Sequence, residues 1–171
     1  MDRRKILERR IRVLLTGFAL GVVLAGVTAF PLPQELTLLV RWTGAQPGTA
    51  GLSGWIARVR DALVDTDAKY PFLAYGTDWL AFGHLVIAAA FLGPIRDPVR
   101  NRFVVRWGMF CCLASIPLAL VMGPLRGVPL FWLPIDLAFG LVGIVPLIAV
   151  DRAIGELEGL TAARSAASPT P

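Results

Sequence analysis

The feature of this sequence that most constrains its fold is a set of four long apolar segments. Each segment has at least the length of about 18 residues with which an α-helix can cross the hydrocarbon core of a bilayer. Three of them follow one another closely between Tyr75 and Gly140, separated only by short turns. This pattern predicts an all-α fold, a polytopic membrane four-helix bundle, with spans at about residues 13–30, 77–94, 107–124 and 132–150.

The composition agrees with a membrane location. Apolar residues make up 56% of the chain and charged residues 17%, and the mean hydropathy is +0.65. The charged fraction is below the quarter or so that is typical of soluble domains. The net charge of +5 would also suit nucleic acid, but the arginines flank apolar segments, where the positive-inside rule and anionic lipid explain them. We therefore expect the lipid bilayer, and no nucleic acid, as a partner, with a second copy of the chain or another membrane protein as further candidates.

The segments between and after the spans are predicted to be helical, flexible or disordered. Residues 31–76 form an amphipathic connection, interrupted by a flexible break at residues 46–51. Its second half shows apolar residues at helical spacing, with Ser53 as the expected N-cap and an end near Lys69. We expect this helix to lie on the membrane surface or to cover the bundle. The tail at residues 165–171 is disordered by composition, and the whole chain is interpreted as one integral membrane domain.

Basic residues predict the orientation of the chain. Six Lys and Arg residues precede the first span, four lie in residues 95–106 and two follow the last span. The connection at residues 31–77 has four over a much longer stretch, and the turn at 125–131 has one. The positive-inside rule then places both termini in the cytosol and the amphipathic connection outside it. A cleaved signal peptide ending near residues 27–29 is the alternative for the first span, which is longer than a usual signal-peptide core.

Four ionisable residues are the candidate site. In this topology Asp78, His84, Arg126 and Asp136 all belong to the outer half of the bundle. We expect Arg126 to pair with Asp136, with Asp78 or with both, because an isolated charge near hydrocarbon is costly. This cluster either locks the helix ends together or forms a shallow outer pocket that binds a small ligand, a proton or a partner. Asp136 also shares a helix face with Gly140, Gly143 and Leu147, a pattern that is typical of an interior packing face.

The positions of the histidine and the two cysteines favour packing roles over catalytic or metal-binding roles. His84 is the only histidine, and it is interpreted as a hydrogen-bonded core residue or as a proton-responsive group. Cys111 and Cys112 are adjacent within an apolar segment, which favours small packing residues over a disulfide or a metal site.

Gly17 and Gly21 begin a row of small residues that suits close helix association, although glycine is also common in membrane helices. No nucleotide, metal or catalytic motif is present in the sequence, so no cofactor and no catalytic residue are predicted.

Four stretches of the sequence are long enough to be specific to a family, namely YPFLAYGTDWLAFGHLVIA, GPIRDPVRN, IPLALVMGPLRGVPLFW and IDLAFGLVGIVPL. They resemble a family of small bacterial inner-membrane proteins with four predicted spans and no assigned activity. The resemblance covers residues 55–147 and the TAFPL that ends the first span, but not QPGTAG or the tail. It implies a fold and a bacterial inner-membrane location without implying a reaction.

Two functional hypotheses follow from the sequence. The first is a non-enzymatic membrane protein that is structural or accessory to a larger complex. The second is a small transporter, or a sensor of protons or of a ligand, that uses the four ionisable residues. An enzyme or redox subunit is the least favoured class, because no set of cofactor ligands is visible.

Overall fold

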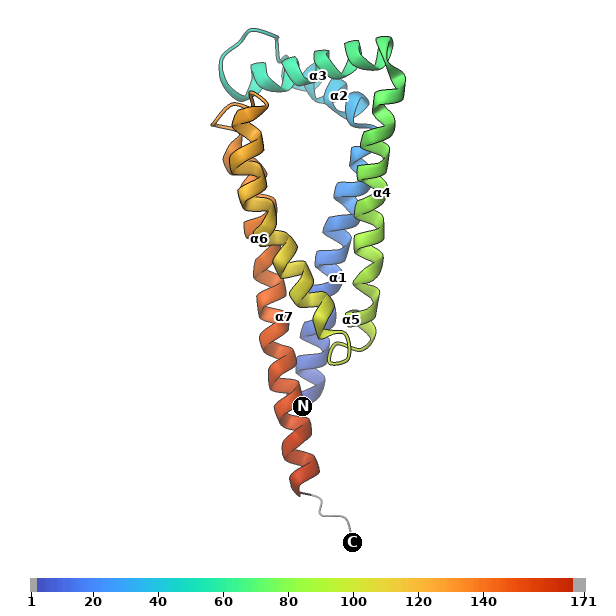
Figure 1. Ribbon diagram of the computed structural model, residues 1–171, viewed down its shortest axis with the longest axis vertical. Coiled ribbons are helices and arrows are strands. Elements are labelled where there is room, and N and C mark those ends of the chain that lie inside the picture. Colours follow the sequence, from blue (N-terminus) through green and yellow to red (C-terminus); the bar gives the residue numbers. More distant parts are fainter. Residues whose placement is uncertain (1–2, 168–171) are drawn as a thin grey trace. The chain divides into compact units, whose positions relative to one another are not determined.

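The computed structural model describes residues 3–167, and the side chains of residues 3–163, as a succession of helices without a β-strand (Figure 1). The elements are α1 (Arg3–Ala29), α2 (Leu32–Thr43), α3 (Gly51–Lys69), the 3-10 helix η1 (Pro71–Leu73), α4 (Ala74–Ala90), α5 (Leu92–Arg96), α6 (Arg102–Leu125) and α7 (Leu133–Ala167). The prediction of an all-α fold is confirmed.

Four helical segments are long and apolar enough to cross a membrane. They are Arg3–Ala29, Pro71–Arg96, Arg102–Leu125 and Leu133–Ala163. Each contains one of the four predicted spans or nearly all of it, and α1 and α7 extend well beyond the predicted limits. The reason is that Arg, Lys and Glu are good helix formers, so the charged ends of these helices continue into water instead of unwinding. The chain is a multi-pass helical membrane protein.

The chain divides into two compact units. Unit 1 comprises residues 1–20 and 89–171, and unit 2 comprises residues 21–88. The first part of α1 therefore belongs to unit 1 and its last part to unit 2. The interpretation of the chain as a single domain stays a prediction.

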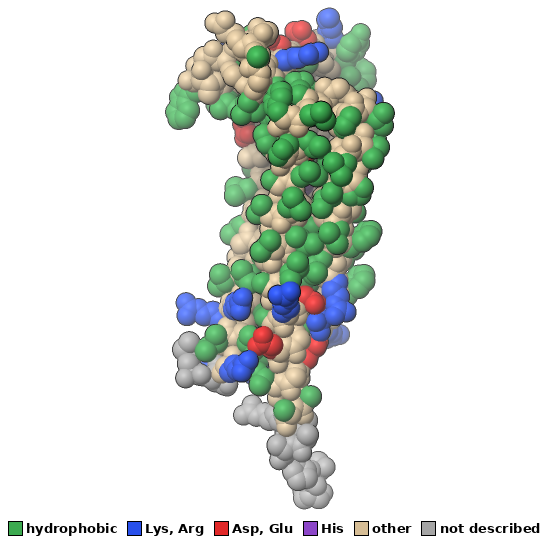
Figure 2. Space-filling model, turned by 90° about the vertical axis from the view of Figure 1, so that its left-hand side faces the viewer, with side chains coloured by type: hydrophobic (Ala, Val, Ile, Leu, Met, Phe, Trp, Pro, Cys, Tyr) green, Lys and Arg blue, Asp and Glu red, His purple; other side chains and the backbone are tan. Residues whose placement is uncertain are grey.

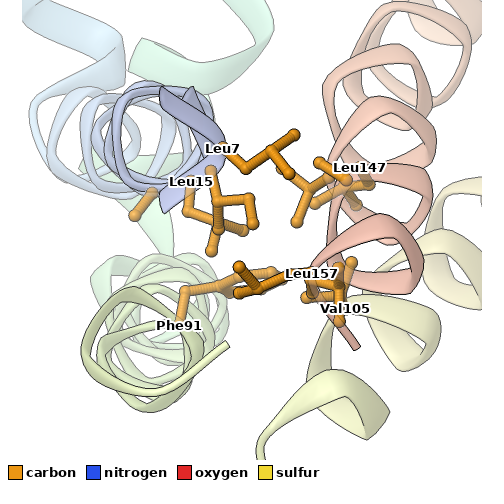
Figure 3. Close-up of a cluster of buried hydrophobic side chains, with 11 residues drawn as sticks. Leu7, Leu15, Phe91, Val105, Leu147 and Leu157 are labelled. Carbon is orange, nitrogen blue, oxygen red and sulfur yellow. The ribbon is translucent and has the colours of Figure 1, made fainter. Parts of the chain in front are cut away.

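The core of unit 1 joins α1 to α7, with contributions from Phe91 and α6. Figure 3 shows Leu7 and Leu15 of α1 pointing toward Leu147 and Leu157 of α7. Phe91, which is fully buried, stacks at a tilt on Phe18 with ring centroids 4.8 Å apart. Burial of these side chains stabilises the unit because close packing gains dispersion contacts even where lipid replaces water.

The α6–α7 pair is held by close approach at small residues. A Cβ atom added to Gly140 of α7 would lie 2.6 Å from the carbonyl oxygen of Cys112 and 2.6 Å from Ser115 Oγ, both of α6. Leu147, on the same face of α7, is fully buried. The predicted packing face of the last span is confirmed for Gly140, Gly143 and Leu147, and Cys112 is one of the residues that it contacts. It is wrong for Asp136, whose side chain is exposed at the start of α7.

Unit 2 consists of the end of α1, the connection and α4. α2 packs on α3 through Val40, Ala45 and Ala57, and α3 runs crosswise to α4 in Figure 1. Gly44 ends α2 in the left-handed region with φ 65°, which glycine adopts without steric cost. The prediction that the helix in the second half of the connection ends near Lys69 is confirmed, because α3 ends at that residue.

Three details of the predicted connection and tail differ from the structure or lie outside it. Ser53 is not the N-cap of α3, because the chain already enters the helix at Gly51 and Ala50 takes the cap position. Residues 165–167 of the predicted disordered tail continue α7, and residues 168–171 lie outside the described residues. A Cβ atom at Gly17 or Gly21 meets no described atom within 4 Å, so this row of small residues packs on no described helix.

Candidate functional site

The four predicted site residues are divided between the two units. Asp78 and His84 lie on α4 in unit 2. Arg126 follows the end of α6 and Asp136 lies in the first turn of α7, both in unit 1. The two pairs therefore belong to different units. That all four side chains lie together stays a prediction.

His84 lies at a close contact between α4 and the end of α1. A Cβ atom added to Gly26 of α1 would come within 2.9 Å of both His84 Cβ and the Ala81 carbonyl oxygen. The ring is half-buried, and its Nδ1 lies 2.8 Å from the carbonyl oxygen of Leu80. That oxygen accepts a hydrogen bond when Nδ1 carries the proton. This surrounding agrees with the interpretation of His84 as a hydrogen-bonded packing residue.

Asp136 accepts a hydrogen bond from the residue that immediately precedes its helix. The indole N–H of Trp132 donates to Asp136 Oδ1 at 2.9 Å, and Asp136 lies in the first turn of α7, where the helix dipole favours a carboxylate. The Arg126 backbone N–H caps α6 by donating to Met122 and Gly123 carbonyl oxygens, at 3.0 and 3.1 Å. Among the described side chains no ion pair joins Arg126 to Asp136. The side-chain partner of Asp136 is therefore Trp132 and not Arg126, which the sequence suggested.

Asp78 lines a cavity of about 230 Å³ within unit 2. A second carboxylate, Asp67 of α3, lies in the same lining, and no Lys, Arg or His does. The cavity forms because the short helix η1 turns the chain from the end of α3 directly into α4, beside the α1–α2 turn. Its remaining lining residues are apolar or neutral, namely Ala29, Phe30, Leu32, Pro33, Gln34, Leu63, Thr66, Leu73, Ala74 and Thr77. The arrangement suits a small cationic group with an apolar portion.

Sequence reasoning missed Asp67 as a partner of Asp78. The two residues are eleven positions apart and belong to different helices, so helical periodicity cannot bring them together. The one available signal was Pro71, two residues after Lys69, which makes a tight turn between the two helices.

A network of ion pairs that the sequence analysis did not predict joins the start of α6 to α7. The Arg102 guanidinium donates to both carboxylate oxygens of Asp151, at 2.7 and 3.0 Å, and to Glu158 Oε2 at 2.6 Å. Arg106 Nε donates to Asp151 Oδ1 at 3.1 Å. Arg102 and Asp151 are each only about one-fifth exposed, and such two-point arginine–carboxylate contacts are stronger and more directional than single ones. The network is a structural clamp between the two helices.

Within the described residues no three His, Cys, Asp or Glu side chains are grouped so that they could hold a metal ion. Cys111 and Cys112 are free thiols, and Cys112 Sγ would be 3.4 Å from a Cβ atom at Gly143 of α7. The thiol therefore fills space between α6 and α7, as the sequence suggested for it.

Comparison with known proteins found no match for this chain among protein-family models, curated proteins or solved structures.

Proposed function

We propose that this chain is a multi-pass protein of the bacterial inner membrane, with both termini in the cytosol, and that it serves there as a non-enzymatic structural or accessory component. The proposal includes membership of the family of small four-span bacterial proteins that the sequence resembles. It is supported by the distribution of basic residues and by the packing roles of the polar residues in the helices.

The observation that carries the proposal is the gathering of three basic segments at one end of unit 1. Arg3 at the start of α1 pairs with Glu156 at 3.2 Å, and Arg102 at the start of α6 pairs with Asp151. These ion pairs place the starts of both helices beside the late part of α7. The turn that carries Arg126 lies at the opposite ends of α6 and α7 (Figure 1). An end that collects Lys and Arg is the one that the positive-inside rule assigns to the cytosol.

Reporter fusions test the orientation. An enzyme that is active only in the periplasm should stay silent when fused after Arg164, and should be active when inserted between Gln46 and Pro47 in the α2–α3 loop. The same pair of fusions with a cytosol-active reporter is the control and should give the opposite pattern. Activity of the periplasmic reporter after Arg164 would contradict the proposed orientation.

The accessory role has a separate test. The chain has a mass of 18.5 kDa, and its mass in a mild detergent can be measured by light scattering with correction for the micelle. A structural or accessory component should purify with a membrane-protein partner in fixed ratio or as an oligomer of itself. A lone chain at every protein concentration, before and after cross-linking in the native membrane, would contradict this role.

A second candidate function is a sensor that binds a small cation in the cavity of unit 2. The observation in its favour is the pair Asp67 and Asp78 in one cavity without a basic residue. Ethanolamine should then raise the melting temperature of the purified protein, and D67N/D78N should abolish the rise. Asp65→Asn is the matched control, because Asp65 lies on the same helix but outside the cavity lining. An equal response of the double variant would exclude this function.

A further inference from the structure

Two adjacent grooves lie on the surface of unit 1 beside α1. The basic groove, of about 470 Å³, is lined by Lys5, Ile6, Arg9, Arg10, Val13 and Leu14. The apolar groove, of about 530 Å³, is lined by Arg10, Leu14, Leu141, Val142, Val145, Pro146 and Ala149. Arg10 and Leu14 line both, so the two grooves lie next to each other. Each volume is in the range of about 300–1,000 Å³ that is usual for ligand sites.

The three cations of the basic groove form no ion pair with any of the described residues. Lys5, Arg9 and Arg10 are all exposed, and none of them forms an ion pair with a described side chain. Other basic side chains at this end of the unit do have carboxylate partners, such as Arg3 with Glu156. Figure 2 shows Lys and Arg side chains gathered toward the end at which α7 finishes, next to a surface where hydrophobic side chains predominate. These three residues therefore present positive charge, not paired with any described carboxylate, at the edge of an apolar surface.

The direction of the grooves follows from the packing of α1 on α7. Phe18 lies near Gly143, whereas Arg3, fifteen residues earlier, pairs with Glu156, thirteen residues later. The two helices are thus antiparallel, as Figure 1 also shows. Arg10 consequently lies at the Ala149 end of the apolar groove. The groove continues along α7 to Leu141, a distance of about 12 Å at the usual rise per residue.

We propose that the two grooves bind one anionic glycerophospholipid. Its phosphate lies among Lys5, Arg9 and Arg10 in the basic groove, and an acyl chain follows the apolar groove along α7. The phosphate oxygens accept hydrogen bonds from the guanidinium N–H groups of Arg9 and Arg10, which pair with no described carboxylate. The acyl chain covers Val142 and Val145, which are 69% and 63% exposed.

Charge complementarity selects a lipid over a second copy of the chain as the occupant. A second copy docked in parallel would bring the same arginines to the contact, where like charges repel. An anionic lipid supplies the opposite charge at one end and an apolar chain at the other, in the order in which the grooves present them. This inference rests on the membrane location alone and is independent of the orientation and of the accessory role.

The test is lipid binding by the full chain in a neutral detergent, measured by native mass spectrometry and by the rise in melting temperature. Phosphatidylglycerol should bind and stabilise the protein, and phosphatidylcholine with the same acyl chains should do so far less. R9Q/R10Q should lower the apparent affinity for phosphatidylglycerol roughly 30-fold, the size expected for two basic side chains at an anionic lipid surface. R96Q/R100Q removes the same charge from exposed positions outside both grooves and should leave the affinity within about twofold.

A second variant tests the apolar groove without changing any charge. Val145→Trp fills the groove and should weaken phosphatidylglycerol binding, whereas Val121→Trp, at an exposed position of α6 outside both grooves, should not. Glycerol 3-phosphate, which has the phosphate without acyl chains, should not compete. Equal binding of both lipids, unchanged binding by R9Q/R10Q and V145W, or full competition by glycerol 3-phosphate would each overturn the proposal. Self-association that is lost in V145W without any lipid effect would assign the groove to a second copy instead.

Discussion

The close contact of α6 and α7 at Gly140 makes a quantitative prediction about stability. Gly140→Ala adds one methyl group, whose carbon would lie 2.6 Å from the carbonyl oxygen of Cys112 and 2.6 Å from Ser115 Oγ. The serine hydroxyl can rotate, although it then loses its 2.8 Å hydrogen bond to Cys112. The carbonyl belongs to the helix backbone and cannot rotate away. The helices must separate by about 0.8 Å to restore ordinary van der Waals contact, which costs about 1–3 kcal/mol as overpacking.

Gly83→Ala is the matched control for this substitution. Gly83 also lies within a membrane-spanning helix, α4, but a Cβ atom there meets nothing within 4 Å. Both substitutions gain up to about 1 kcal/mol of helix propensity, so the comparison isolates the clash. We expect the free energy of unfolding of G140A to be about 1–3 kcal/mol below that of G83A.

The measurement is reversible unfolding in mixed micelles by titration with sodium dodecyl sulfate, followed by circular dichroism. The relevant quantity is the difference in unfolding free energy between the two variants, because both share the same detergent reference. A G140A variant as stable as G83A would refute the reasoning, since it would mean that α6 and α7 do not approach as closely as the structure shows.

Three further predictions concern other contacts of unit 1 in the same unfolding assay. Replacing Arg102 by Gln and Asp151 by Asn, singly and together, should give non-additive losses with a coupling of about 1–2 kcal/mol, because the two side chains share a two-point, partly buried contact; additive losses would show that they act independently. Phe91→Ala should cost about 3–5 kcal/mol, since it empties a fully buried position, and a loss below 1 kcal/mol would contradict the described core. Trp132→Phe removes a single hydrogen bond to an exposed Asp136 and should cost no more than about 1 kcal/mol, whereas a larger loss would assign that bond a greater structural role.

Much of the fold was predictable because it depends on the hydropathy and length of single segments. The four apolar runs predicted four spanning helices, and Gly140, Gly143 and Leu147 predicted the face of α7 that packs on α6, although Asp136, placed in the same row, is exposed. The end of α3 at Lys69 was predictable from the proline that follows. Ser53 was a wrong N-cap prediction because a favourable residue type does not decide where a chain turns; the chain enters the helix earlier, at Gly51.

The candidate site was predictable only in part. Asp78 was identified as an intramembrane carboxylate, which is a functional candidate by default, but its partner in the cavity, Asp67, belongs to another helix. The expected Arg126–Asp136 pair is replaced by the Trp132–Asp136 hydrogen bond. Which side chain forms a hydrogen bond or ion pair with Asp136 depends on the three-dimensional positions that long, rotatable side chains can reach. A helical wheel gives only the direction of each residue around one helix and does not contain these positions.

The sequence by itself determined that this is a helical protein with four membrane spans, because the lack of water in the bilayer leaves a long apolar segment no stable alternative to a helix. Only the tertiary structure decided which helices pack on one another and that Arg102 clamps α6 to α7. It also decided that Lys5, Arg9 and Arg10 lie beside an apolar groove without an ion pair to any described side chain. These features depend on contacts between residues far apart in the chain. Hydropathy is a property of each segment alone, whereas the pairing of charges and the shape of grooves belong to the arrangement of several segments at once.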